Sequence, residues 1–212
     1  MLKRIRSLVS NSSFIEIYDN ALSKKQCEIL INQFEKSYPI PLVVNQIGNE
    51  KTLVHEANVW STYRPDYKKC VQLSPDLSDN TVIGNIIRPC IVEYLKRYKE
   101  FYPSLKEISD WECFNRYNFQ KYERDGDGYK IWHCEHGPGL ECSDRILAWM
   151  FYLNNAKSGT EFMHYPTIRA KLGRLVIWPS AWTHVHKGVI PNKGLKYIVT
   201  GWGAFLPPEQ TA

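Results

Sequence analysis

The pattern of hydrophobic and polar positions differs between the two parts of the chain: two segments with helical spacing lie before about residue 105, and short strand-like runs follow from Trp111 onward. Residues 14–18 alternate, and the segment that follows has one apolar face at helical spacing, formed by Cys27, Leu30, Ile31 and Phe34. Ser23 with Gln26 three positions on is a capping-box pattern. The N-terminal part therefore predicts a strand, a turn and an amphipathic helix that begins after Ser23.

A second helix is predicted for residues 79–101, which carry a broad apolar face. Pro89 lies inside it, and we expect a kink or a split there because proline removes a helical hydrogen bond. Residues 39–78, between the two helices, are rich in turn formers. They predict irregular strands and a long loop.

From Trp111 onward, short runs of β-branched and aromatic residues alternate with clusters of Gly, Pro, Asp and Asn. This spacing predicts an antiparallel sandwich or barrel. No repeat or shift in composition marks a domain boundary. We therefore expect one domain over residues 1–212, with a strand and helical support over about 12–105 and a β core over about 110–206.

Charge and composition exclude few classes of protein. The net charge of +5 comes from 27 basic and 22 acidic residues without a long basic run, so it is too diffuse to indicate a nucleic-acid partner. No window has the length of a membrane span and the N-terminus lacks a signal-peptide pattern, so we expect a soluble, cytoplasmic protein. The six cysteines form no CxxC pair, which argues against a zinc ribbon or thioredoxin-type site.

Candidate metal ligands are concentrated in the segment IWHCEHG. If this segment is extended, His133 and Glu135 lie on one face and Cys134 points the opposite way, into the core. A third ligand must then come from a distant segment, and WPSAWTHVHKG offers His184 and His186. Two histidines and one carboxylate form the facial triad of non-haem Fe(II) oxygenases. Zinc hydrolases use the same ligand types, so ligand identity alone leaves the metal open.

The order of these motifs resembles that of the 2-oxoglutarate and Fe(II)-dependent dioxygenases, and within them the prolyl 4-hydroxylase group. After H-x-E, the segment HKGVIPNKGLKYIVTGW follows the family pattern with His186, Gly188, Gly194 and Lys196. Lys196 stands ten positions after His186, and this family spacing selects His186 over His184 as the distal ligand. GTEF is similar to a shortened glycine-rich turn of the family, and the resemblance covers roughly residues 14–205.

The resemblance implies an α+β fold whose core is a double-stranded β-helix (a jelly-roll, cupin-like core), with N-terminal helices packed against one sheet. It also implies Fe(II) held by His133, Glu135 and His186, with 2-oxoglutarate and O₂ as cosubstrates and ascorbate as a reductant. The chain departs from the family at one ligand. The usual acid is aspartate, and Glu135 is one methylene longer.

Four further residues match the part of the family pattern that binds 2-oxoglutarate. The family's lysine pairs with the C5 carboxylate of this cosubstrate, which gives that role to Lys196. Thr200 lies four positions further on a predicted strand and shares its face, so both side chains can reach one carboxylate. Tyr152 in FYLN and Tyr122 in QKYERDGDGYKIWH match aromatic positions that line the family's pocket.

The activity implied by the resemblance is hydroxylation of an unactivated C–H bond, with succinate and CO₂ as coproducts. The group resembled acts on prolyl residues, so a proline-containing peptide or protein is the expected substrate, as for procollagen-proline 4-dioxygenase. Two alternatives stay open: an oxygenase of the same fold acting on a small molecule or nucleic-acid base, and a metal-binding cupin-like protein that is not an oxygenase. Base oxygenases usually carry arginines where this chain has LKYIVTGW. The oligomeric state is not predicted.

Overall fold

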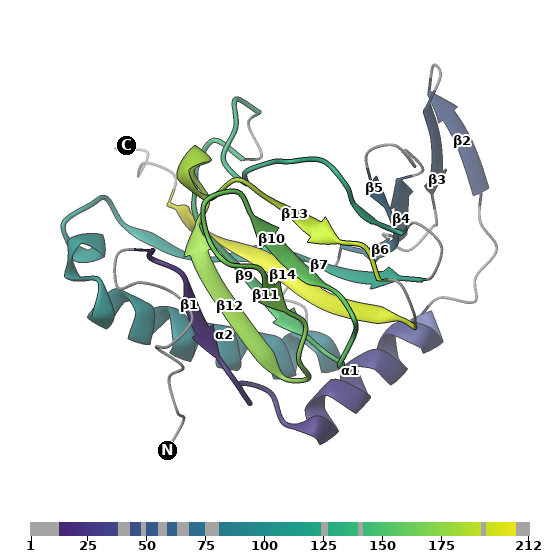
Figure 1. Cartoon of the computed structure of the whole chain (residues 1–212), viewed down its shortest axis with the longest axis horizontal. Coiled ribbons are helices and arrows are strands. Elements are labelled where there is room, and N and C mark those ends of the chain that lie inside the picture. The colour runs from purple at the N-terminus through teal and green to yellow at the C-terminus, as the bar shows by residue number, and fades with distance from the viewer. Residues whose placement is uncertain are drawn as a thin grey trace, which may run out of the picture.

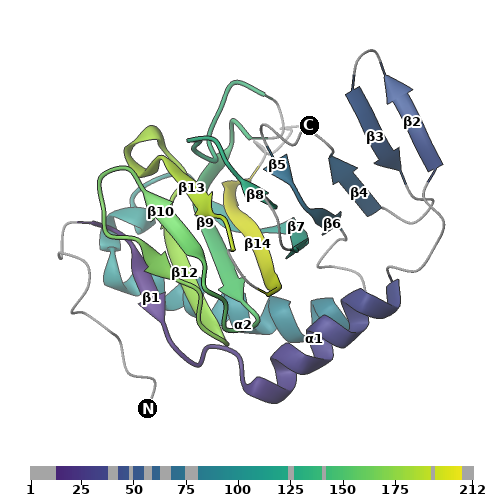
Figure 2. The ribbon, with the colours of Figure 1, turned by 45° about the vertical axis from the view of Figure 1, so that its right-hand side comes forward.

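A long antiparallel sheet organises the fold, and two helices lie along one of its faces (Figures 1 and 2). The computed structural model describes residues 13–37, 43–47, 50–54, 59–62, 68–74, 81–123, 127–139, 142–191 and 194–206. The sheet has the strand order β1-β12-β9-β14-β7-β6-β4-β3-β2. Its strands are β1 (Glu16–Tyr18), β2 (Val43–Ile47), β3 (Glu50–Val54), β4 (Val59–Thr62), β6 (Val71–Leu73), β7 (Trp111–Tyr122), β9 (Arg145–Tyr152), β12 (Arg174–Pro179) and β14 (Lys196–Phe205).

A smaller sheet lies against the other face of the long sheet. It has the order β11-β10-β13, formed by β11 (Ile168–Arg169), β10 (Gly159–Phe162) and β13 (His186–Val189), and a separate pair joins β5 (Lys68–Lys69) to β8 (Gly128–Tyr129). Two facing antiparallel sheets with helices outside confirm the predicted α+β jelly-roll class. The GTEF segment forms strand β10, one of the predicted short strands after Trp111. A side chain at Gly159 would lie 2.1 Å from the Ile168 carbonyl oxygen, so close strand pairing requires glycine there.

Helix α1 (Lys24–Ser37) begins where the capping box predicts. The Ser23 N–H donates to Gln26 Oε1 at 2.9 Å, and the Gln26 N–H donates to Ser23 Oγ at 3.2 Å. Three of the four predicted core residues, Cys27, Leu30 and Phe34, are buried, and Ile31 is half-buried. The local pattern was therefore sufficient to place both the start and the buried face of this helix.

Helix α2 (Val82–Phe101) begins after Thr81, whose side chain accepts a hydrogen bond from the Gly84 N–H at 3.0 Å. It runs past Pro89 without a break, so the expected split does not occur. Pro89 is exposed, while Ile87 and Ile91 on either side are fully buried. Packing of this apolar face holds the helix together across the missing hydrogen bond. Short 3₁₀ turns follow at Pro103–Lys106 and, near β13, at Trp182–His184.

Strand alternation divides the long sheet into two faces with different neighbours. One face packs on the helices and includes Trp149 and Phe151 of β9 with Tyr197 and Val199 of β14. The opposite face, which lies against the smaller sheet, includes Ala148, Met150, Tyr152, Ile198 and Trp202. The side chains of β9 and β14 that can line a site between the two sheets are therefore those of the even-numbered residues. No helix among the described residues is long and apolar enough to cross a membrane.

Candidate active site

Backbone hydrogen bonds, rather than a continuous strand, hold the segment that carries two of the predicted ligands. The N–H of His133 donates to the carbonyl of His186 at 3.0 Å, and the N–H of His186 donates back at 2.8 Å, which forms an isolated bridge. The N–H groups of Glu135 and His136 both donate to the Ser180 carbonyl at 3.0 Å. These bonds fix the H-x-E segment against the start of β13.

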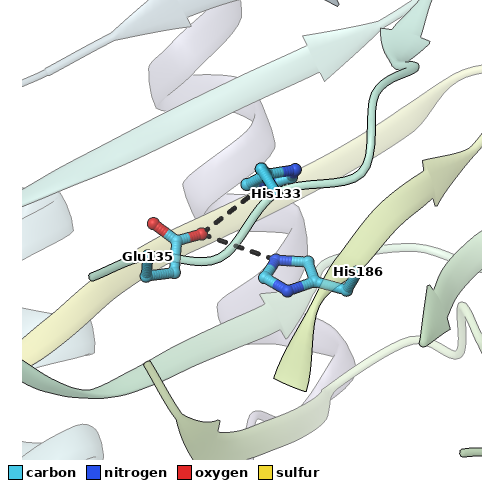
Figure 3. Close-up of side chains that lie close together, drawn as sticks. All are labelled: His133, Glu135 and His186. Atoms are coloured by element: carbon cyan, nitrogen blue, oxygen red, sulfur yellow. Dashed lines mark ion pairs between the residues drawn. The ribbon is translucent and has the colours of Figure 1, made fainter. Parts of the chain in front are cut away.

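Three predicted ligands converge at this point (Figure 3). Glu135 Oε1 lies 3.7 Å from His133 Nε2 and 3.5 Å from His186 Nε2. The three ligand atoms all lie within 4.8 Å of one another, and no other cluster of this kind occurs in the part of the chain that the structure describes. The side chains are mostly buried, with 14%, 15% and 5% of His133, Glu135 and His186 exposed.

In both histidines, Nε2 is the ring nitrogen that is left to bind a metal. His133 Nδ1 lies 3.1 Å from the Ile131 carbonyl oxygen, and His186 Nδ1 lies 2.9 Å from the His184 carbonyl oxygen. A carbonyl oxygen only accepts hydrogen bonds, so Nδ1 carries a proton in both rings, and Nε2 is the nitrogen that can bind a metal in place of its own proton. The same second contact orients metal-binding histidines generally.

Glu135 is held by its outer oxygen. Trp202 Nε1 donates to Glu135 Oε2 at 2.8 Å, and Arg145 Nη1 lies 3.5 Å from the same oxygen. The Arg145 guanidinium in turn lies 3.7 Å from the centre of the Trp202 ring. Burial raises the pKa of the Glu135 carboxyl, but the facing imidazoles of His133 and His186 outweigh burial and hold that pKa well below its usual range. The carboxylate is therefore ionised and aimed at both histidines.

This donor set fits Fe(II). It offers two imidazole nitrogens with available lone pairs and one carboxylate oxygen on one side of a site, which is the facial-triad chemistry of non-haem iron. The extra methylene of Glu135 is accommodated because Trp202 holds the far oxygen. The ligand roles themselves stay a prediction.

His184 and Cys134 point away from this group. His184 Nε2 donates to the Ser13 carbonyl at 2.7 Å, and Thr183 Oγ1 lies 2.9 Å from His184 Nδ1, so both ring nitrogens are engaged. The prediction that Cys134 points into the core is wrong. Cys134 is partly exposed and its thiol donates to the His136 carbonyl at 3.2 Å. Strand alternation does not apply to it because the strand β8 ends at Tyr129.

A cavity of about 240 Å³ adjoins the three ligands and reaches between the sheets. Its walls include the predicted residues Lys196, Thr200 and Tyr122. Tyr152 does not line the cavity. It is fully buried, and its hydroxyl lies 2.6 Å from Oγ1 of Thr160, which does line the cavity. Direct contact between Tyr152 and a cosubstrate therefore stays a prediction.

Lys196 is a buried cation with no anion beside it among the described residues. Only 3% of the residue is exposed, and its Nζ lies 4.4 Å from the centre of the Tyr122 ring. Burial lowers the pKa of Lys196 to about 8, and Cys70 offsets this only in part. Such a group suits a carboxylate that enters the cavity. Thr200 Oγ1 already donates to the Trp149 carbonyl at 2.9 Å.

Several residues of the site were not found in the sequence. Trp202 could have been, because it stands two positions after Thr200 and alternation puts both on one face. Arg145 and Lys68 carried no sequence signal, since both lie at strand ends whose neighbours only the fold determines. Tyr129 stacks on His133 with ring centres 3.6 Å apart, which the sequence also did not indicate.

Comparison with known proteins supports the resemblance found in the sequence. Residues 116–203 match the family model of the 2OG-Fe(II) oxygenase superfamily. That segment contains the three predicted ligands and Lys196. No curated protein sequence matches the chain.

Solved structures share the fold at low sequence identity. A viral collagen prolyl hydroxylase of Paramecium Bursaria Chlorella virus-1, in a 2-oxoglutarate complex, has a TM-score of 0.64 at 19% identity, covering 92% of this chain and 98% of that one. A Pseudomonas putida prolyl-4-hydroxylase has 0.61 at 12%, covering 92% and 95%. A Trichoplax adhaerens prolyl hydroxylase bound to a hypoxia inducible factor peptide has 0.63 at 14%, covering 92% and 84%.

Proposed function

We propose that this chain, whose residues 116–203 match the family model of the 2OG-Fe(II) oxygenase superfamily, is such an oxygenase and hydroxylates a prolyl residue of a peptide or protein. The observation that carries the proposal is one cavity with two complementary ends. Three metal-type ligands stand at one end and the buried cation Lys196 stands at the other. A dicarboxylate cosubstrate bound to a metal needs both.

The side chains have distinct roles in this proposal. His133, Glu135 and His186 hold Fe(II), which when bound supplies the oxidative decarboxylation of 2-oxoglutarate and the oxidising power for C–H hydroxylation. Lys196 pairs with the distal carboxylate and so fixes the orientation of the cosubstrate. Thr160 and Tyr122 line the same walls.

A prolyl substrate is supported by the fold that this chain shares with three prolyl hydroxylases, one of them in complex with a hypoxia inducible factor peptide fragment. A metal protein that is not an oxygenase would have no use for the buried ammonium of Lys196. A base oxygenase is not favoured by any group in the described cavity wall.

The test is an incubation of the purified protein with Fe(II), 2-oxoglutarate, O₂ and a set of proline-containing peptides. We expect a peptide product that has gained one oxygen atom, together with peptide-stimulated formation of succinate. The variant His186→Ala is the control for iron-dependent turnover. If neither product forms with any peptide, while 2-oxoglutarate still binds, the prolyl substrate is wrong.

A further inference from the structure

The described lining of the cavity has an excess of positive charge. It contains three cations, Lys68, Arg145 and Lys196, and one carboxylate, Glu135, which leaves two positive charges. The two charges of Fe(II) and the two of 2-oxoglutarate cancel each other. With both bound, the described lining of the cavity in the proposed enzyme is therefore still positive, and one of its three cations has no assigned partner among the described residues.

That cation is Lys68. Lys196 is assigned to the cosubstrate, and Arg145 lies against Glu135 and the Trp202 ring. Lys68 Nζ lies 5.4 Å from the centre of the Tyr129 ring, and that ring is stacked on His133 at 3.6 Å. The Tyr129 ring thus contacts both the Lys68 ammonium and His133, a predicted metal ligand. Lys68 is half-buried and can be reached from solvent.

Neutral amides, not carboxylates, hold Lys68 in place. Its Nζ donates to Gln72 Oε1 at 2.7 Å, and this oxygen also accepts from Gln120 Nε2 at 2.8 Å. Gln120 Oε1 in turn accepts from the Tyr122 hydroxyl at 2.6 Å, which links the network to the wall beside Lys196. Amide dipoles fix the position of an ammonium without neutralising it, so its charge stays available to a ligand at little further ordering cost.

Lys69, which follows Lys68 in the chain, is by contrast neutralised by a carboxylate. Lys69 Nζ lies 2.9 Å from Asp127 Oδ1, an ordinary ion pair, and Lys69 does not line the cavity. No carboxylate of the described residues is paired with Lys68. Two adjacent lysines of one short strand, β5, therefore differ in whether a protein carboxylate neutralises them.

We propose that Lys68 recognises a carboxylate of the substrate, so that the enzyme prefers an acidic peptide with Asp or Glu beside the residue to be hydroxylated. This inference rests on the proposed function. An acidic peptide is favoured over a nucleic acid because the described aromatic ring that Lys68 contacts, Tyr129, is already stacked on His133 and offers less surface for a base.

The test uses three peptides that differ only beside the target proline, where they carry Glu, Gln or Lys. Both kcat/KM for hydroxylation and equilibrium binding of the fluorescently labelled peptides are measured at low and high salt. We expect the Glu peptide to exceed the Gln peptide roughly fivefold to tenfold in both quantities, as for a partly buried charge pair. The advantage should shrink as salt rises.

Variants then assign the preference to one side chain. Lys68→Gln should bring the Glu-to-Gln ratio close to one, and Lys68→Glu should favour the Lys peptide. Lys69→Gln is the matched control, because that lysine neighbours Lys68 in the chain but lies outside the cavity wall, and it should keep the wild-type ratio. Melting temperatures verify that all variants fold. Within each variant the ratio cancels any effect on metal or cosubstrate loading.

The outcomes separate the inference from the proposed function. Equal hydroxylation of all three peptides leaves the function standing and overturns the role of Lys68. Preferential binding of the Glu peptide without hydroxylation supports Lys68 recognition and contradicts the prolyl reaction. An unchanged ratio in Lys68→Gln with weaker 2-oxoglutarate binding would assign Lys68 to the cosubstrate instead. If an oligonucleotide competes for binding more strongly than the Glu peptide does, the inference that Lys68 recognises an acidic peptide is wrong.

Discussion

The two ends of the cavity differ in whether neighbouring residues hold the side chains that face a ligand. At the metal end, each predicted ligand has a second contact that fixes its orientation: the Ile131 carbonyl for His133, the His184 carbonyl for His186, and the indole of Trp202 for Glu135. At the other end, Lys196 is buried beneath Tyr122 and no described residue accepts a hydrogen bond from it.

This difference follows from the role that we propose for each end of the cavity. A metal site needs atoms at defined positions, so its side chains are held before the ion arrives. A site for a charged cosubstrate can instead keep a buried charge uncompensated, so that the incoming anion gains the full interaction. The first arrangement is stable without a ligand, whereas the second lowers the stability of the empty protein.

The largest expected effect separates the two neighbouring histidines at the metal end. His186→Ala should lower Fe(II) affinity and 2-oxoglutarate turnover more than about 100-fold, since even outer contacts of metal ligands are worth 10–100-fold. His184→Ala should keep turnover and lose about 1–3 kcal/mol of stability, because it leaves the buried Ser13 carbonyl without its donor. Turnover assays and thermal unfolding measure the two effects. Equal loss of turnover in both variants would contradict the choice of His186.

The lysine end predicts a gain in stability together with a loss of binding. Lys196→Met should weaken 2-oxoglutarate binding roughly 10–100-fold, because a charge-assisted interaction with its carboxylate is lost. The same change should stabilise the ligand-free protein near pH 7 by on the order of 2–3 kcal/mol, since it removes a buried, uncompensated charge. Calorimetric titration of the cosubstrate and thermal unfolding check the two statements.

The pH dependence of that gain has a definite sign. The folded-state pKa of Lys196 is about 8, below its ordinary value of 10.5. The cost of the buried ammonium is therefore complete below pH 8 and disappears as the pH rises toward 10.5. The stability difference between Lys196→Met and wild type should shrink over the same window. Lys121→Met is the control: Lys121 is also buried but pairs with Glu35 at 3.1 Å, so its removal should destabilise the protein and spare cosubstrate binding.

The smallest expected effect concerns the contact that holds Glu135. Trp202→Phe keeps a ring for Arg145 but removes the indole donor to Glu135 Oε2, and we expect Fe(II) affinity to fall about tenfold. Metal titration measures it. Trp178→Phe is the matched control, because the Trp178 ring contacts His186 at 5.1 Å while its Nε1 has no hydrogen-bond partner in the described structure. Equal affinity losses would mean that ring packing, not the hydrogen bond, orients the ligands.

Much of the fold could be predicted because its signals are local. The capping box placed the start of α1, and the apolar face at helical spacing identified Cys27, Leu30 and Phe34 as buried. Alternation along β14 placed Lys196 and Thr200 on one face, and both line the cavity. Each of these inferences needs only neighbouring residues in one regular element.

The errors arose where no regular element exists. Cys134 was assigned to the core because the segment around it was read as a strand, but hydrogen bonds to Ser180 and His186 give that segment an irregular path. Pro89 was expected to kink or split its helix, and the split does not occur because packing against the sheet keeps the helix whole.

The sequence by itself determined the faces of the regular strands, because these follow from residue identity and backbone periodicity. It also predicted the types of the ligands, and the resemblance to the dioxygenase family supplied the spacing that links His186 to Lys196. Only the tertiary structure decided that Trp202 and Arg145 hold Glu135, that Lys196 is buried with no anion beside it among the described residues, and that Lys68 is held by amides while Lys69 is neutralised. Those properties depend on contacts between distant segments and on burial away from water, and neither produces a periodic pattern in the sequence.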